Sequence, residues 1–340
     1  MRRLKLAFLF AVKCLGGFAI ARRLTRQHLK ILCYHGFALK DEAVFRPKLF
    51  ISPQVFEQRM ERLRQLGLRV LPLDQAVTQM YEGRMPDDAL VITIDDGFHS
   101  VATIAAPVLA RHGFPSTVYV TSYYVKHAVP VFRLVVQYMV WKTAQARLVL
   151  NGHDWHPDGE VDLRDPGLRE AFSDHCIRYG EALDQEAGRL RICEELGQLL
   201  GVPFQDIIDQ RILHLMTPDQ LRGLEAQHMD VQLHTHRHRF PRDDEAVASR
   251  EIEDNRCSLS DWLPGRQLVH FCYPSGIWDE RQWAWLDDLG VRSSTTCLSG
   301  LNSAATPRHA LYRFLDGDNI HPLEFEAAVS GFSDLIKRRY

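Results

Sequence analysis

Several features that would place this 340-residue chain in a simple class are missing from its sequence. Basic charge is not in excess, because 41 Lys and Arg residues oppose 43 Asp and Glu residues, and we therefore expect no nucleic-acid partner. The 7 cysteines are odd in number and scattered, and none forms a Cys-x-x-Cys pair, which argues against a disulfide framework. Internal repeats and low-complexity tracts are also absent. The hydrophobic fraction of 46% indicates a globular protein with a sizeable core.

Acidic residues are missing from the first 40 positions, which carry nine basic ones. Residues 4–21 are mostly apolar, but Lys5 and Lys13 leave no uncharged run near the ~20 residues of a spanning helix. We expect residues 1–27 to form a basic amphipathic helix on an anionic membrane surface. Its cations would then meet lipid head groups; they are Lys13, Arg22, Arg23 and Arg26.

Two other interpretations of residues 1–27 stay open. Arg2 and Arg3 precede the apolar stretch, and Ala19-Ile20-Ala21 has the small-x-small form of a signal-peptide cleavage site. Alternatively, the segment is a helix packed on the body of the protein. The location is therefore either cytoplasmic or peripheral at the inner face of the membrane, or exported through an atypical signal peptide.

Short apolar runs alternate with helical periodicity along residues 28–340, which predicts an α/β protein with a parallel sheet or barrel and helices outside. The expected strands are 31–34, 69–72, 89–94, 117–121, 230–233, 268–273 and 291–296, and the expected helices include 56–66, 73–82, 104–112 and one that begins after Thr217. Residues 131–215 break the alternation. Their pattern is mostly helical, with a polar, turn-rich stretch at 151–166, and we interpret them as an insertion.

Two adjacent carboxylates, Asp95 and Asp96, end the apolar strand 91–94 and precede Gly97. Adjacent acids repel each other, so either a cation or a raised pKa on one of them is expected. Both outcomes serve acid–base or metal chemistry. The alternative is a solvated Asp-Gly turn.

Three histidines, His234, His236 and His238, fall within five positions at the end of another apolar strand. His234 and His238 share a face whether the segment is extended or helical. Imidazole together with carboxylate oxygen is a ligand set for zinc or a similar divalent metal. The alternative is a group of ordinary surface or core histidines.

Two more strand ends carry polar groups. The turn that follows Phe271 and Cys272 contains Pro274-Ser275-Gly276, which can aim a backbone N–H outward as an oxyanion donor. His35 follows Tyr34 at the end of the first strand and could equally make a structural hydrogen bond. In barrels the active site is built from such carboxyl-terminal strand ends.

Together these segments resemble one known family. Tyr34-His35, Thr93-Ile94-Asp95-Asp96-Gly97, His234-Thr235-His236-Arg237-His238 and Phe271-Cys272-Tyr273-Pro274-Ser275-Gly276 occur in the order found in polysaccharide deacetylases with NodB homology, carbohydrate esterase family 4. The resemblance spans most of residues 30–315. It implies a distorted (β/α) barrel that hydrolyses N-acetyl groups of amino sugars with a divalent metal, most commonly Zn²⁺.

The resemblance also implies roles by position. Asp96, His234 and His238 would be metal ligands, Asp95 the general base, Thr235 the family's hydroxyl residue and Ser275 the backbone oxyanion donor. The expected partner is an N-acetylated glycan, contacted by His35, Tyr273 and Arg313.

Three positions depart from the family pattern. Cys272 stands where the family has an arginine that orients the base, and Arg313 is a candidate for the missing cation. Ser275 replaces the tyrosine that follows the proline. No clear Leu-x-x-His motif supplies the general acid, so His236, His309 and His35 are the candidates, with His236 taken as the catalytic one.

The function expected from these residues is a metal-dependent hydrolase that removes N-acetyl groups from a poly- or oligosaccharide. Two alternatives remain. One is a carbohydrate-binding protein without turnover, and the other is a deacylase for a different small acyl group.

Overall fold

The computed structural model describes residues 2–337, and its central feature is an all-parallel sheet. The strands, in their order across the sheet, are β11 (Ser293–Thr295), β10 (His270–Cys272), β9 (Met229–Leu233), β6 (Ser116–Val120), β5 (Ala89–Ile94), β1 (Lys30–Tyr34) and β12 (Phe314–Leu315), with β4 (Arg69–Val70) paired to β5. Every residue of β1, β5 and β6 is buried. Burial on both faces explains why these strands are mostly apolar or β-branched, with Lys30 and Ser116 as the polar exceptions at their first positions.

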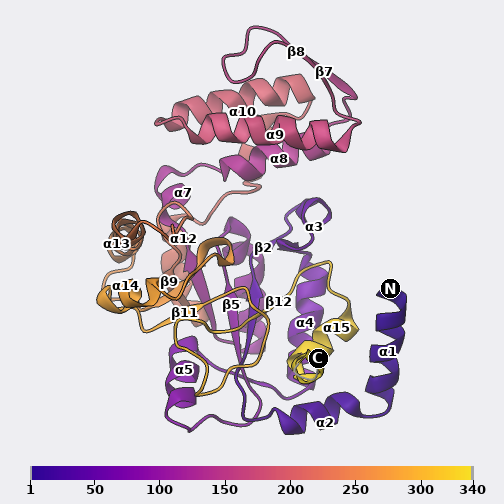
Figure 1. The fold of residues 1–340 in the computed structure, drawn as a ribbon, viewed down its shortest axis with the longest axis vertical. Helices are drawn as coiled ribbons and strands as arrows, with labels where there is room; N and C mark the ends of the chain where they lie inside the picture. The colour runs from indigo at the N-terminus through magenta and orange to yellow at the C-terminus, as the bar shows by residue number, and fades with distance from the viewer. Residues whose placement is uncertain (1, 338–340) are drawn as a thin grey trace. The chain divides into compact units, whose positions relative to one another are not determined.

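The sheet curls until its two edges meet. Thr295 in β11 forms a parallel bridge with Leu311, and three residues later Phe314 pairs with Leu32 of β1. One short segment, Leu311 to Leu315, therefore contacts β11 on one side and β1 on the other, and closes a distorted barrel. The α/β barrel expected from the sequence is confirmed (Figure 1).

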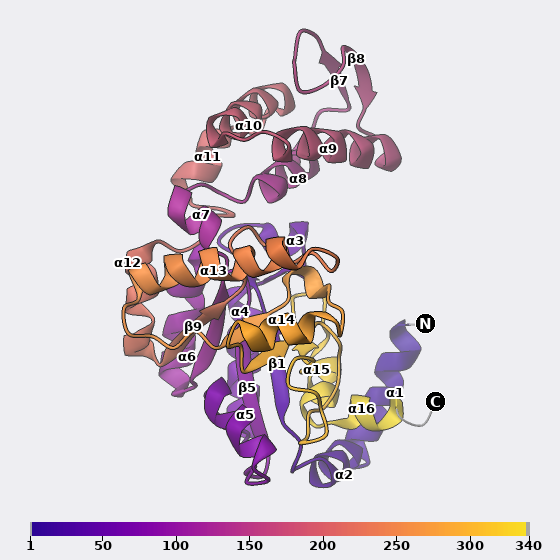
Figure 2. The same cartoon turned by 60° about the vertical axis from the view of Figure 1, so that its left-hand side comes forward.

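Helices surround this sheet in both ribbon views (Figures 1 and 2). They are α3 (Glu42–Phe45), α4 (Pro53–Gln65), α5 (Leu73–Tyr81), α6 (Ala106–His112), α7 (Ser122–His127), α12 (Pro218–Gly223), α13 (Glu245–Trp262), α14 (Gln282–Asp288), α15 (Pro322–Val329) and α16 (Phe332–Lys337). Short helical turns are η1 (Val101–Ala105), η2 (Glu225–Gln227) and η3 (Pro274–Gly276), and β2 (Gly36–Phe37) pairs with β3 (Phe50–Ile51). The predicted start of α12 is confirmed, because Thr217 and Gln220 form a reciprocal capping box.

The chain divides into two compact units, of which the second is His127–Leu215. It contains α8 (Phe132–Lys142), α9 (Pro166–Glu181), α10 (Glu186–Leu200), α11 (Phe204–Asp209) and the antiparallel hairpin of β7 (Arg147–Leu150) and β8 (Gly159–Asp162). Fully buried Trp155 donates its indole N–H to Glu195. The hairpin lies partly in the stretch expected to be turns. Its strands are half exposed and short, so their apolar pattern is weak.

Residues 2–24 form two helices rather than one, α1 (Arg2–Cys14) and α2 (Gly17–Leu24), and Gly16 between them has a left-handed φ of 77°. Leu9 and Phe18 are buried against Ala327 of α15, with Phe332 of α16 alongside. Lys13 bonds Glu326 and Arg22 bonds Asp88. The expectation that these two cations face head groups is therefore wrong, since carboxylates of the body already neutralise them.

Among the described residues, no single helix has the length and apolar composition needed to cross a membrane. The pair α1 and α2, bent by 77°, meets those two criteria only when both helices are counted together.

Candidate active site and metal centre

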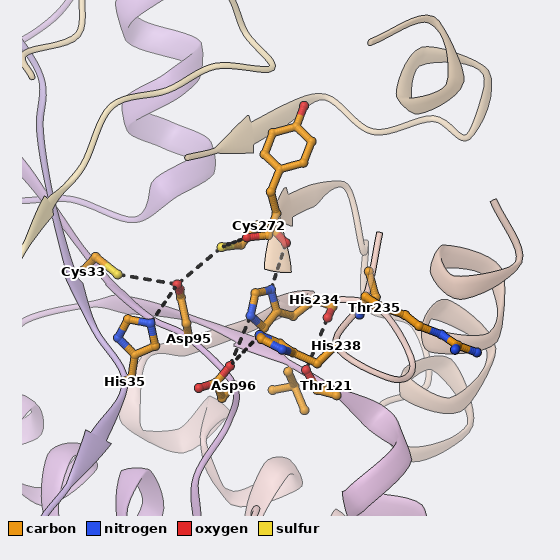
Figure 3. A network of polar contacts seen from close by, with 12 residues as sticks. Cys33, His35, Asp95, Asp96, Thr121, His234, Thr235, His238 and Cys272 are labelled. Atoms are coloured by element: carbon orange, nitrogen blue, oxygen red, sulfur yellow. Dashed lines mark hydrogen bonds and ion pairs between the residues drawn. The ribbon is translucent and has the colours of Figure 1, made fainter. Parts of the chain in front are cut away.

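The polar segments singled out in the sequence come together at the carboxyl ends of four strands (Figure 3). Asp95 and Asp96 follow β5, His234 follows β9, Cys272 ends β10, and His35 follows β1. Parallel strands place all of these ends at one edge of the barrel. Two groups result: one surrounds Asp96 and the other surrounds Asp95.

The first group joins Asp96 with two imidazoles. Asp96 Oδ1 lies 3.3 Å from His234 Nε2 and 3.3 Å from His238 Nε2. Ligands of a tetrahedral zinc ion, with bonds of about 2.0–2.1 Å, lie about 3.3 Å from one another. The three side chains can therefore hold a divalent cation, and one carboxylate with two imidazoles leaves a coordination position open.

The backbone of the Asp-Asp-Gly turn aims Asp96 at this point. Asp96 and Gly97 both have a left-handed φ, 68° and 85°. Aspartate tolerates this conformation better than most residues, and a Cβ at Gly97 would lie 3.1 Å from Val120. The turn bends the chain sharply after β5, so successive carboxylates face different partners.

A tight loop returns His238 to the side of His234. Thr235 and His238 have φ values of 65° and 55°, and Thr235 Oγ1 accepts the N–H of Arg239 at 3.1 Å. Strained backbone of this kind persists only where the surroundings hold it. Buried Glu251 on α13 does so, because its carboxylate accepts the N–H of Arg237 and bonds the guanidinium groups of Arg237 and Arg239.

A hydrogen bond at one ring nitrogen of His234 sets the orientation and tautomer of the imidazole. The Nδ1–H of His234 donates to the carbonyl of Cys272 at 2.8 Å, which leaves the lone pair of Nε2 available to a cation held between Nε2 and Asp96. Its backbone N–H donates to Asn255 Oδ1. Asn255 and Glu251 were missed by sequence reasoning. The available signal was a pair of polar residues at i and i+4 on the buried face of α13.

The second group centres on a buried ion pair. Asp95 Oδ1 lies 2.7 Å from Arg313 Nη1, and Asp95 Oδ2 lies 2.8 Å from Nη2. Both side chains are at most 3% exposed. Burial by itself would raise the pKa of Asp95, but the attraction and hydrogen bonds of Arg313 outweigh it and hold that pKa well below its usual range.

Two thiols and an imidazole complete the surroundings of Asp95. Cys33 Sγ and Cys272 Sγ lie 3.5 and 3.4 Å from Asp95 Oδ2, and His35 Nε2 lies 3.7 Å from it. These donors could also group around an ion. The guanidinium of Arg313, however, already occupies both oxygens of Asp95 and would repel a second cation there. A cation is therefore favoured on the Asp96 side.

The turn after β10 borders this edge. Ser275 has a φ of 57°, and its backbone N–H has no hydrogen-bond partner among the described residues. Gly276 is required next to it, since a Cβ there would lie 2.7 Å from Cys297 Cβ. Ser275 and His238 line one pocket, together with Pro274 and Phe240. An unpaired N–H beside a pocket is a donor that a substrate oxygen can use.

Four expected site residues are buried and held by contacts within the protein. His236 and His309 are buried, with Nδ1 against Ser122 Oγ and Ser294 Oγ, and His309 Nε2 also contacts Asp287. Tyr273 is 1% exposed and donates its hydroxyl to the carbonyl of His309. Arg313 is 0% exposed. The expected substrate contacts of Tyr273 and Arg313 are therefore corrected, because neither side chain reaches solvent.

Comparison with known proteins adds information at the level of the fold. No protein-family model and no curated protein matches this sequence. Among solved structures, the deacetylase PplD of Streptococcus pyogenes in complex with acetate matches with a TM-score of 0.60 and 15% identity over 89% of this chain and 98% of its own.

Two further structures match over similar lengths. IcaB from Ammonifex degensii has a TM-score of 0.54 and 17% identity over 89% of this chain and 97% of its own. A de-N-acetylase from Aggregatibacter actinomycetemcomitans has a TM-score of 0.55 and 12% identity over 88% and 98%. Across most of its length, this chain has the fold of the polysaccharide deacetylases.

Proposed function

We propose that the protein is a metal-dependent hydrolase that removes N-acetyl groups from the amino sugars of a glycan. One observation carries this proposal: Asp96, His234 and His238 converge on a point beside an ionised, buried Asp95. A cation site next to a carboxylate is the arrangement that water-dependent cleavage of an amide requires. The similarity to deacetylase structures supports the same reaction class.

In this proposal Asp95 is the general base. It accepts a proton from the attacking water, and Arg313 positions it through both carboxylate oxygens. A divalent ion, most commonly zinc in such ligand sets, supplies Lewis-acid chemistry by polarising the acyl oxygen and lowering the pKa of water. The N–H of Ser275 would donate to the acyl oxygen as negative charge develops on it.

His35 replaces His236 as the proposed proton donor to the leaving amine. Apart from the proposed ligands, it is the histidine whose ring approaches Asp95 in the described part of the chain. Burial lowers the pKa of His35, so its ring is mainly neutral at rest. The proton given to the amine would then be the one released by water, passed through Asp95.

Two alternatives differ from the proposal in specific ways. A carbohydrate-binding protein without turnover needs only the cation site, so the complete Asp95–Arg313 pair argues against it. A deacylase for another small acyl group would use the same residues, and only the shape of the pocket would distinguish it.

The test is release of acetate from a panel of N-acetylated glycans by protein loaded with Zn²⁺, with Co²⁺, or stripped by chelator. We expect metal-dependent release from at least one glycan and none from the stripped protein. Glycan binding with no acetate release under any loading would favour the binding protein. Release of another acyl group but not acetate would favour the wider deacylase.

A further inference from the structure

The outward face of α1 and α2 is apolar and uncovered. Six of the fourteen exposed large apolar side chains of the described residues lie between positions 4 and 24: Leu4 (77% exposed), Phe8 (53%), Phe10 (60%), Leu15 (84%), Ile20 (61%) and Leu24 (66%). We call these six residues the outer apolar face. A cluster of this kind on a folded protein marks an interaction surface.

The periodicity of α1 sorts its residues into two faces. Leu9 is buried against the body, and Leu4 and Leu15 lie on the opposite side of the helix at 100° per residue. Ala7, Ala11 and Cys14 lie between them, all exposed. The outward side is thus apolar along the whole helix, with Arg3 as its one charged residue.

The cations of α1 and α2 are divided between the two sides. Lys5 and Lys13 form ion pairs with Glu324 and Glu326, and Arg22 forms one with Asp88. These three cations therefore attach the helices to the rest of the protein. Arg3 and Arg23 make no ion pair within residues 2–337 and are exposed. No acidic residue occurs before Asp41. Within residues 2–24, the unpaired charges beside the outer apolar face are therefore positive.

From this arrangement we infer that the outer apolar face inserts into the interface of a lipid bilayer that contains anionic lipids. The 13 residues of α1 span about 20 Å, too short for a hydrocarbon core of about 30 Å. A helix of this length with one fully apolar side lies in the plane of the interface. Apolar insertion would supply most of the affinity, while Arg3 and Arg23 would favour anionic head groups.

This inference differs from attraction by a basic helix in one measurable respect. Charge attraction is screened by salt, whereas apolar insertion is not. The full chain should therefore sediment with vesicles of phosphatidylcholine and phosphatidylglycerol at low and at high salt, and more weakly with phosphatidylcholine alone. Loss of nearly all binding at high salt would overturn the inference.

A matched pair of triple variants tests the surface itself. Leu4→Gln, Phe10→Gln and Leu15→Gln together should reduce vesicle binding at least ~100-fold, because three inserted side chains are lost. Val44→Gln, Val149→Gln and Leu168→Gln replace apolar residues elsewhere that are also more than half exposed, and should leave binding unchanged. Equal binding by the first variant and the wild type would overturn the inference.

A fluorescent probe removes dependence on how well the variants fold. Cys14 and Cys257 are both exposed, on α1 and α13 respectively. An environment-sensitive label on Cys14, with Cys257→Ser, should shift to the blue when vesicles are added. The same label on Cys257, with Cys14→Ser, should not shift.

The competing occupant is a second copy of the chain. If light scattering shows a wild-type dimer that the first triple variant splits, and the Cys14 label responds to protein concentration but not to vesicles, then the surface is a dimer interface and the membrane inference fails.

Discussion

Two buried aspartate–arginine pairs lie at the same edge of the barrel, yet their carboxylates differ. Asp95 meets both terminal nitrogens of Arg313, and its pKa lies well below the usual range. Asp316 Oδ2 accepts from Arg59 Nε at 3.0 Å and from the hydroxyl of Tyr34, while Oδ1 has no hydrogen-bond partner within residues 2–337. Burial outweighs these contacts and raises the pKa of Asp316 to about 6. Two bonded oxygens, rather than proximity to arginine, keep a buried carboxylate ionised.

The alternation of β1 separates the two pairs. Cys33 faces Asp95 inside the barrel, and Tyr34, the next residue, faces Asp316 on the outside. His35 returns to the side of Asp95. Neighbouring side chains at the end of β1 thus contact two different carboxylates, that of the proposed base Asp95 and that of Asp316.

The largest expected difference between the two pairs is in turnover. Asp95→Asn should lower the rate of acetate release about 10²–10⁴-fold while metal stays bound, because the amide cannot accept a proton from water. Asp316→Asn should keep the rate near that of the wild type. Metal content and acetate release are measured on the same samples. Loss of metal in Asp95→Asn would make Asp95 a ligand instead of the base.

Replacing each arginine separately should lower the unfolding free energy by different amounts in the two pairs. Arg313→Met should cost about 3–5 kcal/mol of unfolding free energy, because it leaves a buried charge without a partner. Arg59→Met should cost less, about 1–2 kcal/mol, because Asp316 can take up a proton near neutral pH. Denaturant unfolding at neutral pH measures both values. Equal losses would mean that the two carboxylates are alike.

The pH dependence of stability tests Asp316 alone. Its folded pKa of about 6 exceeds that of an unfolded aspartate, about 3.8, so the native state holds a proton that the unfolded state has lost. The resulting stability is present below about pH 4 and is lost as pH rises through 6. We expect the wild type to lose on the order of 2–3 kcal/mol more than Asp316→Asn across this range. Parallel curves for the two proteins would show that Asp316 has an ordinary pKa.

The smallest expected effect comes from the thiols. Cys33→Ser and Cys272→Ser should each change the unfolding free energy by about 1 kcal/mol and leave turnover within a fewfold range, since a thiol is a weak donor. Arg313 would still hold both oxygens of Asp95. A loss of unfolding free energy as large as that of Arg313→Met would show that the thiols are as important as Arg313 for stabilising the Asp95 carboxylate. Unfolding curves and acetate release decide between these results.

Local sequence signals were enough to select four residues that the structure brings close together. Asp95, Asp96, His234 and His238 were identified because each is an expensive polar residue directly after an apolar strand. Arg313 was harder to assign, since its partner is 218 positions away and joins it only through the two-residue β12, too short for a hydrophobic pattern. Glu251 and Asn255 were missed because a helix face shows its polar contacts only after packing. His236 was selected as the general acid from its place in the motif, and sequence spacing does not reveal that its Nδ1 lies against Ser122 Oγ.

The segment that closes the barrel also contains Arg313, whose guanidinium pairs with Asp95. Arg313 lies between Leu311, which contacts β11, and Phe314, which contacts β1, and its own N–H and Nε bond the carbonyls of Leu298 and Thr296. Loss of the contacts that residues 311–315 make with β11 and β1 would separate Arg313 from Asp95 while leaving Asp96, His234 and His238 in place. Under the proposed mechanism, local fraying of this segment would stop turnover before the protein unfolds globally. Amide exchange at residues 311–315, rather than the melting temperature, would then report the temperature at which activity is lost.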